Sequence, residues 1–158
     1  MRIALFVLAG TVGLVATIGV VFVAGMRRKT PAVLNAVKWT SRATKRFVLK
    51  SAGSTTSPTA VVRHVGRASG RVYETPVVAV PVDGGFAVAL PYGMTADWAK
   101  NVLATGKATI VLHGTTHEVD GPELVAIDAV DAYFGLREQR MHKQFGVREA
   151  MRLRVGVL

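Results

Sequence analysis

The residues best suited to bind a ligand lie in a short glycine-flanked turn, Gly66-Arg67-Ala68-Ser69-Gly70-Arg71. Glycine lets the chain turn sharply, and such a turn leaves backbone N–H groups free beside two arginines and one hydroxyl. Successive N–H groups form a concavity for an anion, and a guanidinium holds phosphate or carboxylate oxygens with two parallel hydrogen bonds. The turn therefore has the chemistry of an anion site, although the same composition also serves an ordinary hairpin turn.

The remaining polar residues do not form a catalytic or metal-binding pattern. Cysteine is absent, which excludes disulfides, thiolate nucleophiles, iron–sulfur clusters and cysteine zinc sites. No Ser/His/Asp set is apparent. Four histidines have no spacing that is typical of a metal-ligand set: His64, His113, His117 and His142. We therefore expect no bound metal, and the sequence identifies no catalytic residue.

Further motifs follow the glycine–arginine turn along the chain. Thr75-Pro76 and Asp83-Gly84-Gly85 come first, and Pro91-Tyr92-Gly93 then precedes Asp97-Trp98-Ala99-Lys100-Asn101. This combination resembles the deazaflavin-dependent nitroreductase family over about residues 58–155. The resemblance implies a split β-barrel related to flavin-binding barrels, with coenzyme F-420, an 8-hydroxy-5-deazaflavin, as the cofactor. A bound coenzyme would carry the chemistry, while the protein supplies orientation and excludes water. FMN is the less favoured cofactor.

The resemblance also implies a coenzyme site on this chain. The turn would surround the phosphate and acidic tail, the following strand would lie beside them, and the short helix would close the site around the ring. The residues assigned in this way are Arg67, Ala68, Ser69, Tyr73, Thr75, Pro76, Tyr92, Gly93, Trp98, Lys100 and Asn101. Cations at Arg67, Arg71 and Lys100 suit a polyanionic tail. Tyr92 and Trp98 suit a planar ring, and the alternative for Trp98 is a packing anchor of its helix.

Two features depart from the family pattern. Glu74 puts a negative charge within the predicted anion-binding face. Family members that reduce nitroaromatics or quinones resemble one another in tyrosines near the C-terminal helix, and only Tyr133 lies in that region here. The acceptor pocket is therefore less well defined than the fold.

Short apolar runs separated by turn signals predict the elements that position these residues. Strands are expected at Thr59–Val65, Val72–Val82, Phe86–Leu90, Lys107–His113, Thr116–Ile127 and Met151–Val157, and helices at Ala96–Ala104 and Ala129–Gln144. Thr95 would cap the first helix. Pro76 and Pro81 indicate bulges or edge positions in the longest strand. Residues 59–158 are thus predicted to form an α+β domain, a small split antiparallel β-barrel with appended helices.

The charges of the chain are distributed unevenly. Residues 3–26 carry no charge, residues 27–50 carry eight cations and no acid, and residues 51–158 carry eleven cations and ten acids. The net charge of +10 therefore lies beside an apolar segment, which argues against nucleic-acid binding by the domain. An uncharged helix of this length reaches about 36 Å, enough to span a hydrocarbon core of about 30 Å. We expect a transmembrane anchor over residues 1–26, with a cleaved signal peptide as the alternative.

Residues 27–58 are predicted to form a basic juxtamembrane helix and linker. Thr30 and Pro31 are typical of an N-cap followed by the first helical position. Cations fall on one face of this helix: Lys38, Arg42, Lys45, Arg46 and Lys50. Such a helix is expected to lie on an anionic lipid surface, with docking on the domain as the alternative. The cations place the domain in the cytoplasm, behind a single pass through the inner (plasma) membrane.

The sequence leaves more than one function open. The first is a membrane-anchored oxidoreductase that transfers a hydride from a reduced deazaflavin to a lipophilic acceptor, a quinone or nitro compound. The second is a non-catalytic accessory subunit of a larger integral membrane complex such as a transporter, attached through its transmembrane helix. A barrel that binds FMN or haem is the third.

Overall fold

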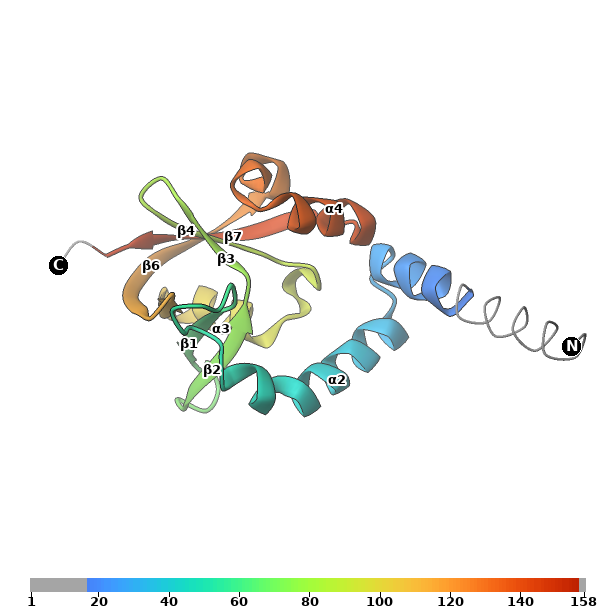
Figure 1. Cartoon of the computed structure of the whole chain (residues 1–158). Coiled ribbons are helices and arrows are strands. Elements are labelled where there is room, and N and C mark those ends of the chain that lie inside the picture. Colours follow the sequence, from blue (N-terminus) through green and yellow to red (C-terminus); the bar gives the residue numbers. More distant parts are fainter. Residues whose placement is uncertain (1–16, 157–158) are drawn as a thin grey trace, which may run out of the picture.

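The computed structural model describes residues 17–156, which form a curled antiparallel sheet with helices packed around it (Figure 1). The strands are β1 (Ala60–Val65), β2 (Val72–Val77), β3 (Ala79–Val82), β4 (Gly85–Ala89), β5 (Lys107–Leu112), β6 (Thr115–Ala126) and β7 (Glu149–Val155). The helices are α2 (Pro31–Leu49), α3 (Asp97–Thr105) and α4 (Leu136–Phe145), with short 3₁₀ turns η1 (Gly93–Thr95), η2 (Ile127–Ala129) and η3 (Asp131–Tyr133).

A single bent segment curls the sheet towards a barrel. The strand order is β2–β1–β5–β6–β7–β4–β3, and the two edge strands are consecutive in the chain, with Val78 between them. Residues 72–82 therefore pair with β1 through their first half and with β4 through their second half. Pro76 and Pro81 lie in these edge strands, where a missing N–H interrupts no interior ladder. The predicted long strand and the edge positions of its prolines are confirmed, with one break at Val78.

The barrel core is built from alternate residues of the strands, whose side chains point inward. Its largest fully enclosed side chains include Leu90, Ile110, Met151 and Leu153. Helix α3 packs onto this core through Trp98, Ala99 and Val102. A second cluster joins β4 and β7 to the segment that follows β6: Ala87, Ile127, Val130, Phe134, Val147 and Ala150. The first core thus holds the first turn of α3, and the second packs against Phe145 at the end of α4.

The predicted second helix, Ala129–Gln144, is wrong in its first half. Residues 127–133 form the two turns η2 and η3, and α4 begins only at Leu136. Gly135 is extended at φ −62°, ψ 157°, and a glycine in a helix interior costs roughly 1 kcal/mol relative to alanine. Thr95 does not cap α3, because its hydroxyl donates to the carbonyl oxygen of Tyr92 and the N-cap residue is Ala96.

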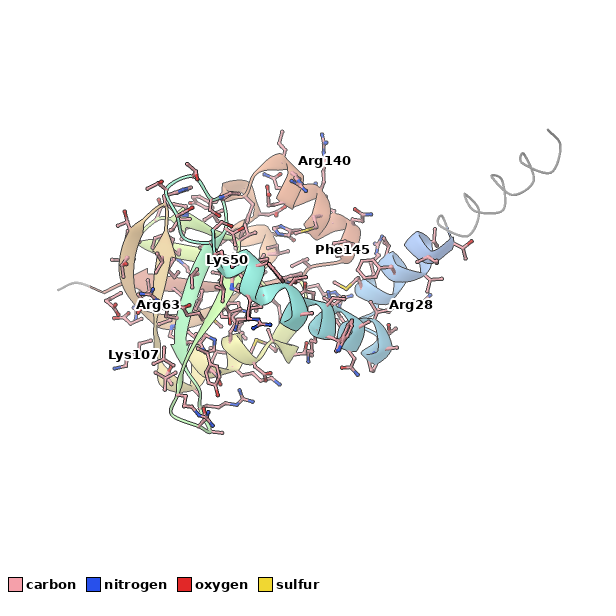
Figure 2. The ribbon with its side chains drawn as sticks, turned by 60° about the horizontal axis from the view of Figure 1, so that its bottom comes forward. Arg28, Lys50, Arg63, Lys107, Arg140 and Phe145 are labelled. Atoms are coloured by element: carbon pink, nitrogen blue, oxygen red, sulfur yellow. The ribbon has the colours of Figure 1, made fainter. Side chains whose placement is uncertain are left out.

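The N-terminal part of the described chain packs against the domain. Residues 17–27 are helical, and within them Gly25 and Met26 are buried. The ring of Phe22 meets that of Phe145 edge to face, with 6.0 Å between the centroids, and Figure 2 shows Phe145 beside this segment. Lys29 Nζ donates to the carbonyl oxygens of Pro91, at 2.5 Å, and of Phe145, at 3.3 Å. This segment is therefore tied both to the loop after β4 and to the end of α4.

These contacts correct the predicted transmembrane anchor. Among residues 17–156, no helix is long and apolar enough to cross a membrane. The anchor over residues 1–26 and the single-pass plasma-membrane localisation are therefore wrong, since the apolar residues at the end of that segment are used for packing on α4. Residues 1–16 of the predicted span lie outside the described residues. The fold is a mixed α/β arrangement around a curled antiparallel sheet, without the predicted transmembrane helix.

Helix α2 begins where the sequence predicts, with Thr30 extended as N-cap and Pro31 in the first turn. One face of α2 lies toward the barrel, while Trp39 and Phe47 on its other face are 72% and 70% exposed. The chain then returns to the sheet at Gly53, whose N–H donates to the carbonyl oxygen of Thr59 at 2.7 Å. In Figure 1 residues 17–30 pass from the neighbourhood of α4 to α2. We call residues 17–49 the N-terminal strap.

Candidate functional site

Two adjoining pockets lie where the strap, the barrel and α3 meet. The polar pocket, of about 420 Å³, is lined by the turn at residues 66–69 and by side chains of β1, β2, α2 and α3. The apolar pocket, of about 530 Å³, extends between the strap, the loop after β4 and α4. Four residues line both: Lys45, Thr75, Asp97 and Trp98. Each volume is in the range of small-molecule sites, so the two together suit a ligand with a charged end and a flat end.

The polar pocket is built around the glycine–arginine turn. The N–H of Gly66 donates to the carbonyl oxygen of Arg71 and that of Gly70 to Gly66, both at 2.8 Å. Gly70 has φ +66°, which glycine adopts at no steric cost. These bonds leave the N–H groups of Ala68 and Ser69 without a hydrogen-bond partner among the described residues. The turn therefore presents free donors of the kind that bind an oxyanion.

Asn101 on α3 holds Arg67 at the pocket wall. The side-chain oxygen of Asn101 accepts from the backbone N–H of Arg67 at 3.2 Å and from its guanidinium at 2.7 Å. Asn101 itself is buried, so its amide has a fixed orientation. The guanidinium is 42% exposed on its side chain and lies 3.7 Å from a carboxylate oxygen of Asp97. Arg67 is thus pre-positioned, with part of its donor capacity still open to a ligand.

The same amide sets the tautomer of His64. Because the oxygen of Asn101 accepts from Arg67, its nitrogen donates to His64 Nδ1, at 3.2 Å. His64 Nε2 then carries the proton and donates to the hydroxyl oxygen of Thr75, also at 3.2 Å. Burial and, to a smaller extent, the charge of Lys45 together lower the pKa of His64 to about 4, with Asp97 opposing the shift. His64 is therefore neutral near pH 7, and the hydroxyl proton of Thr75 is free to be donated into the pockets.

His64 should make the stability of the protein depend on pH. Its folded pKa, about 4, lies below its unfolded value of 6.5, so the unfolded chain binds more protons between these values. The contribution of neutral His64 to the free energy of unfolding is therefore fully present above pH 6.5 and is lost as the pH falls towards 4. We expect the free energy of unfolding to fall by about 2–3 kcal/mol more in the wild type than in His64→Gln between pH 7 and pH 4.5. Urea unfolding at both pH values measures this, and parallel pH dependences would contradict it.

Strand alternation places Tyr73 and Thr75 of β2 on the pocket side and Glu74 on the other face. Tyr73 stacks on His64 with ring centroids 5.8 Å apart, and its hydroxyl lies 3.0 Å from that of Ser69. Glu74 pairs instead with Arg63 of β1 at 2.8 Å. Glu74 is therefore not a negative charge within the pocket, contrary to the expectation from the sequence.

Apolar side chains form most of the second pocket. The barrel side is formed by residues on both sides of the bend in the edge strand and after β4: Pro76, Val77, Val78, Ala89, Leu90, Pro91 and Tyr92. The strap contributes Phe22, Met26, Val37 and Val48, and α4 contributes Met141, His142 and Phe145. Burial raises the pKa of the Tyr92 hydroxyl, so this group stays protonated at neutral pH. The pocket can therefore enclose a flat, largely uncharged group.

Most residues assigned from the sequence lie around these pockets. Arg67, Ala68, Ser69, Tyr73, Thr75, Trp98 and Asn101 line the polar pocket, and Pro76 and Tyr92 line the apolar one. Gly93 and Lys100 line neither pocket, and neither does Arg71. Sequence reasoning did not assign Lys45, His64, Asp97 or His142 to the site. Helical spacing could have placed Lys45 on the face of α2 that carries Val37 and Val48, but nothing in the sequence indicated which side that face would meet.

No protein-family model matches the sequence, and no curated protein sequence matches it. Among solved structures, the chain is similar to HutZ, the heme storage protein from Vibrio cholerae, with a TM-score of 0.51 and 17% identity over 66% of this chain and 85% of that one. It is also similar to an F420-H2 dependent reductase, FDR-A, with a TM-score of 0.49 and 12% identity over 61% of this chain and 93% of that one.

A further likeness is to the protein Atu2129 from Agrobacterium tumefaciens, described as of unknown function, with a TM-score of 0.49 and 16% identity over 68% of this chain and 53% of that one. At such low identities the likeness to HutZ extends to the fold alone. This chain therefore shares the curled antiparallel sheet of that protein.

Proposed function

We propose that this protein is an oxidoreductase that binds a reduced 8-hydroxy-5-deazaflavin coenzyme and passes its hydride to a lipophilic acceptor of the quinone or nitro-compound class. The observation that carries the proposal is the junction of a cationic polar pocket with an apolar pocket at Trp98. The resemblance of the Gly66–Arg71 turn and the Trp98–Asn101 helix to deazaflavin-dependent proteins supports the same reading.

The residues of the polar pocket fit the anionic part of such a coenzyme. The free N–H groups of Ala68 and Ser69, the guanidinium of Arg67 and the ammonium of Lys45 are all donors. Lys45 comes from α2 and Arg67 from the barrel, so an anion between them would be held from two sides. The carboxylate of Asp97 balances part of this charge, which leaves a net positive pocket with a neutral His64 behind it.

The apolar pocket fits the ring and the acceptor. When bound, the coenzyme supplies a hydride donor, and the protein needs no nucleophile of its own. Trp98 forms the wall between the two pockets, while the strap covers the apolar pocket and limits access of water. Water exclusion favours hydride transfer to the acceptor over side reactions. The lipophilic walls favour an acceptor that is flat and poorly soluble in water.

Titration with the reduced coenzyme tests the proposal, with coenzyme fluorescence as the readout. Wild-type protein should bind it, and Lys45→Gln should weaken binding about tenfold because one charge-assisted contact is lost. Arg46→Gln is the matched control: Arg46 is exposed on the same helix, lines neither pocket, and should leave the affinity unchanged. Removing Lys45 should also raise the pKa of His64, which NMR can follow without any ligand.

Parallel titrations with FMN and with haem separate the remaining cofactors. Binding of the deazaflavin, with turnover when a quinone or nitro compound is added, supports the proposed oxidoreductase. Absence of deazaflavin binding at high micromolar coenzyme contradicts it, and tight binding of FMN or haem in that case would identify the barrel as a carrier of the other group.

A further inference from the structure

A buried histidine–aspartate pair lies at the end of the apolar pocket formed by α4. His142 Nδ1 lies 2.7 Å from a carboxylate oxygen of Asp131 in η3, and the side chain of His142 is 3% exposed. The imidazole also meets the ring of Phe134 edge to face, with 4.9 Å between the centroids. The orientation of the imidazole is therefore set by groups on both sides of it.

The hydrogen bond to Asp131 decides which nitrogen is free. A carboxylate accepts, so Nδ1 carries a proton and donates it to Asp131, and Nε2 remains for a ligand. Nε2 makes no hydrogen bond with the described residues. Every fully buried side-chain nitrogen or oxygen atom among those residues has a hydrogen-bond partner, so Nε2 is not one of the fully buried atoms. Since His142 lines the apolar pocket and is otherwise enclosed, this atom opens into that pocket.

The charged groups near the pair are few. Asp131 is the acid in contact with the ring. From the N-terminal strap, Lys29 donates a hydrogen bond to the carbonyl oxygen of Phe145, which lies three residues after His142 in the chain. The other titratable side chains that line the apolar pocket come from α2, the loop after β4 and the start of α3: Lys38, Lys45, Tyr92 and Asp97. A carboxylate hydrogen-bonded to the far nitrogen fixes the tautomer of an imidazole and stabilises its protonated form.

We propose that His142, held by Asp131, is the proton donor to the acceptor that binds in the apolar pocket. This proposal rests on the proposed function. Reduction of a quinone to a hydroquinone requires one hydride and one proton. The quinone gains the hydride, and with it two electrons, from the reduced deazaflavin. The deazaflavin is oxidised because it loses these two electrons. The donor is His142 with a proton on each nitrogen: a quinone oxygen gains the proton on Nε2, the neutral imidazole keeps its Nδ1 proton hydrogen-bonded to Asp131, and solvent then returns a proton to Nε2. A positioned general acid of this kind accelerates a reaction about 10²- to 10⁴-fold.

The decisive variant is His142→Asn in the full chain. The asparagine amide nitrogen takes the place of Nδ1 and can still donate to Asp131, while the group that would protonate the acceptor is removed. With reduced deazaflavin and a 1,4-naphthoquinone, kcat should fall about 100-fold or more, and the coenzyme Kd should change less than threefold. Asp131→Asn should lower kcat by a smaller factor, because the imidazole stays in place but loses the carboxylate that fixes its orientation.

His113→Asn is the matched control. His113 lies at the exposed tip of the β5–β6 hairpin with φ +50°, a conformation that asparagine accepts readily, and it lines neither pocket. It should leave kcat unchanged. A second readout needs no coenzyme: the naphthoquinone alone should shift the NMR signal of His142 Nε2 in the wild-type protein.

The outcomes separate this proposal from the proposed function. If the wild type binds and oxidises the coenzyme but His142→Asn is as fast as the wild type, the pair only joins η3 to α4 and the proton-donor role is overturned. An unshifted Nε2 signal on addition of the naphthoquinone also overturns it, even if the variant fails to fold. If the wild type binds no deazaflavin, the proposed function fails and the proton-donor role fails with it.

Discussion

Trp98→Ala should lower both the stability of the fold and its affinity for the coenzyme. Trp98 is 9% exposed, belongs to the barrel core and lines both pockets. Removing a buried tryptophan costs about 3–5 kcal/mol, a large share of the stability of a small domain. Loss of the wall between the pockets should also weaken coenzyme binding roughly tenfold, because contact with the aromatic ring is lost. Chemical denaturation and coenzyme titration measure the two effects.

The chain contains its own control for this experiment. Trp39 is the other tryptophan and is 72% exposed on the outer face of α2, so Trp39→Ala should change stability by less than about 0.5 kcal/mol. Trp98→Phe keeps an aromatic wall at a smaller cost in stability and allows the affinity to be measured if Trp98→Ala unfolds. A coenzyme affinity unchanged in Trp98→Phe and in folded Trp98→Ala would mean that Trp98 is only a packing anchor.

Arg67→Ala should separate binding from stability. The guanidinium is a charged donor of the polar pocket, and loss of a charge-assisted hydrogen bond costs roughly 1.5–3 kcal/mol, or about ten- to a hundredfold in affinity. The backbone N–H of residue 67 would still donate to the buried oxygen of Asn101, so that oxygen keeps a partner. The melting temperature should therefore change little. Coenzyme titration and thermal unfolding of the same preparation test both statements.

Arg63→Ala is the comparison for Arg67. Arg63 is also on the turn side of the barrel, but it pairs with Glu74 on the face opposite the pocket. An exposed ion pair of this kind contributes about 0–1 kcal/mol, and the coenzyme affinity should be unaffected. Equal losses of affinity in the two variants would indicate a general effect of positive charge and would contradict a specific role for Arg67.

Local sequence determined much of the barrel. Turn residues and apolar alternation predicted each of its strands to within a few positions, because these signals act between neighbours in the chain. Gly106 ends α3 in the left-handed conformation, since glycine has no side chain to oppose it. The predicted helix over Ala129–Gln144 shows the limit of such local signals, because the chain is extended at Gly135 and α4 begins only at Leu136.

The N-terminal segment shows where hydrophobicity and charge alone mislead. An apolar run followed by cations predicts a membrane anchor, yet an apolar side chain is equally satisfied by packing on protein. Phe22 and Met26 meet the apolar pocket and α4, and Lys29 is held by two carbonyl oxygens of the domain. Local patterns do not indicate which surface such residues will meet, because the carbonyl oxygens that hold Lys29 lie 62 and 116 positions further along the chain.

The composition of the glycine–arginine turn follows from local sequence alone, because its glycines, arginine and hydroxyl are adjacent in the chain. The surroundings of that turn depend instead on how distant parts of the chain pack together. Closure of the sheet by residues 72–82 brings β2 beside β1, so that Asn101, His64 and Thr75 form one hydrogen-bonded chain behind Arg67. Docking of α2 then directs Lys45 into the polar pocket. Contacts between distant segments depend on how the whole core packs, and short-range patterns carry no information about them.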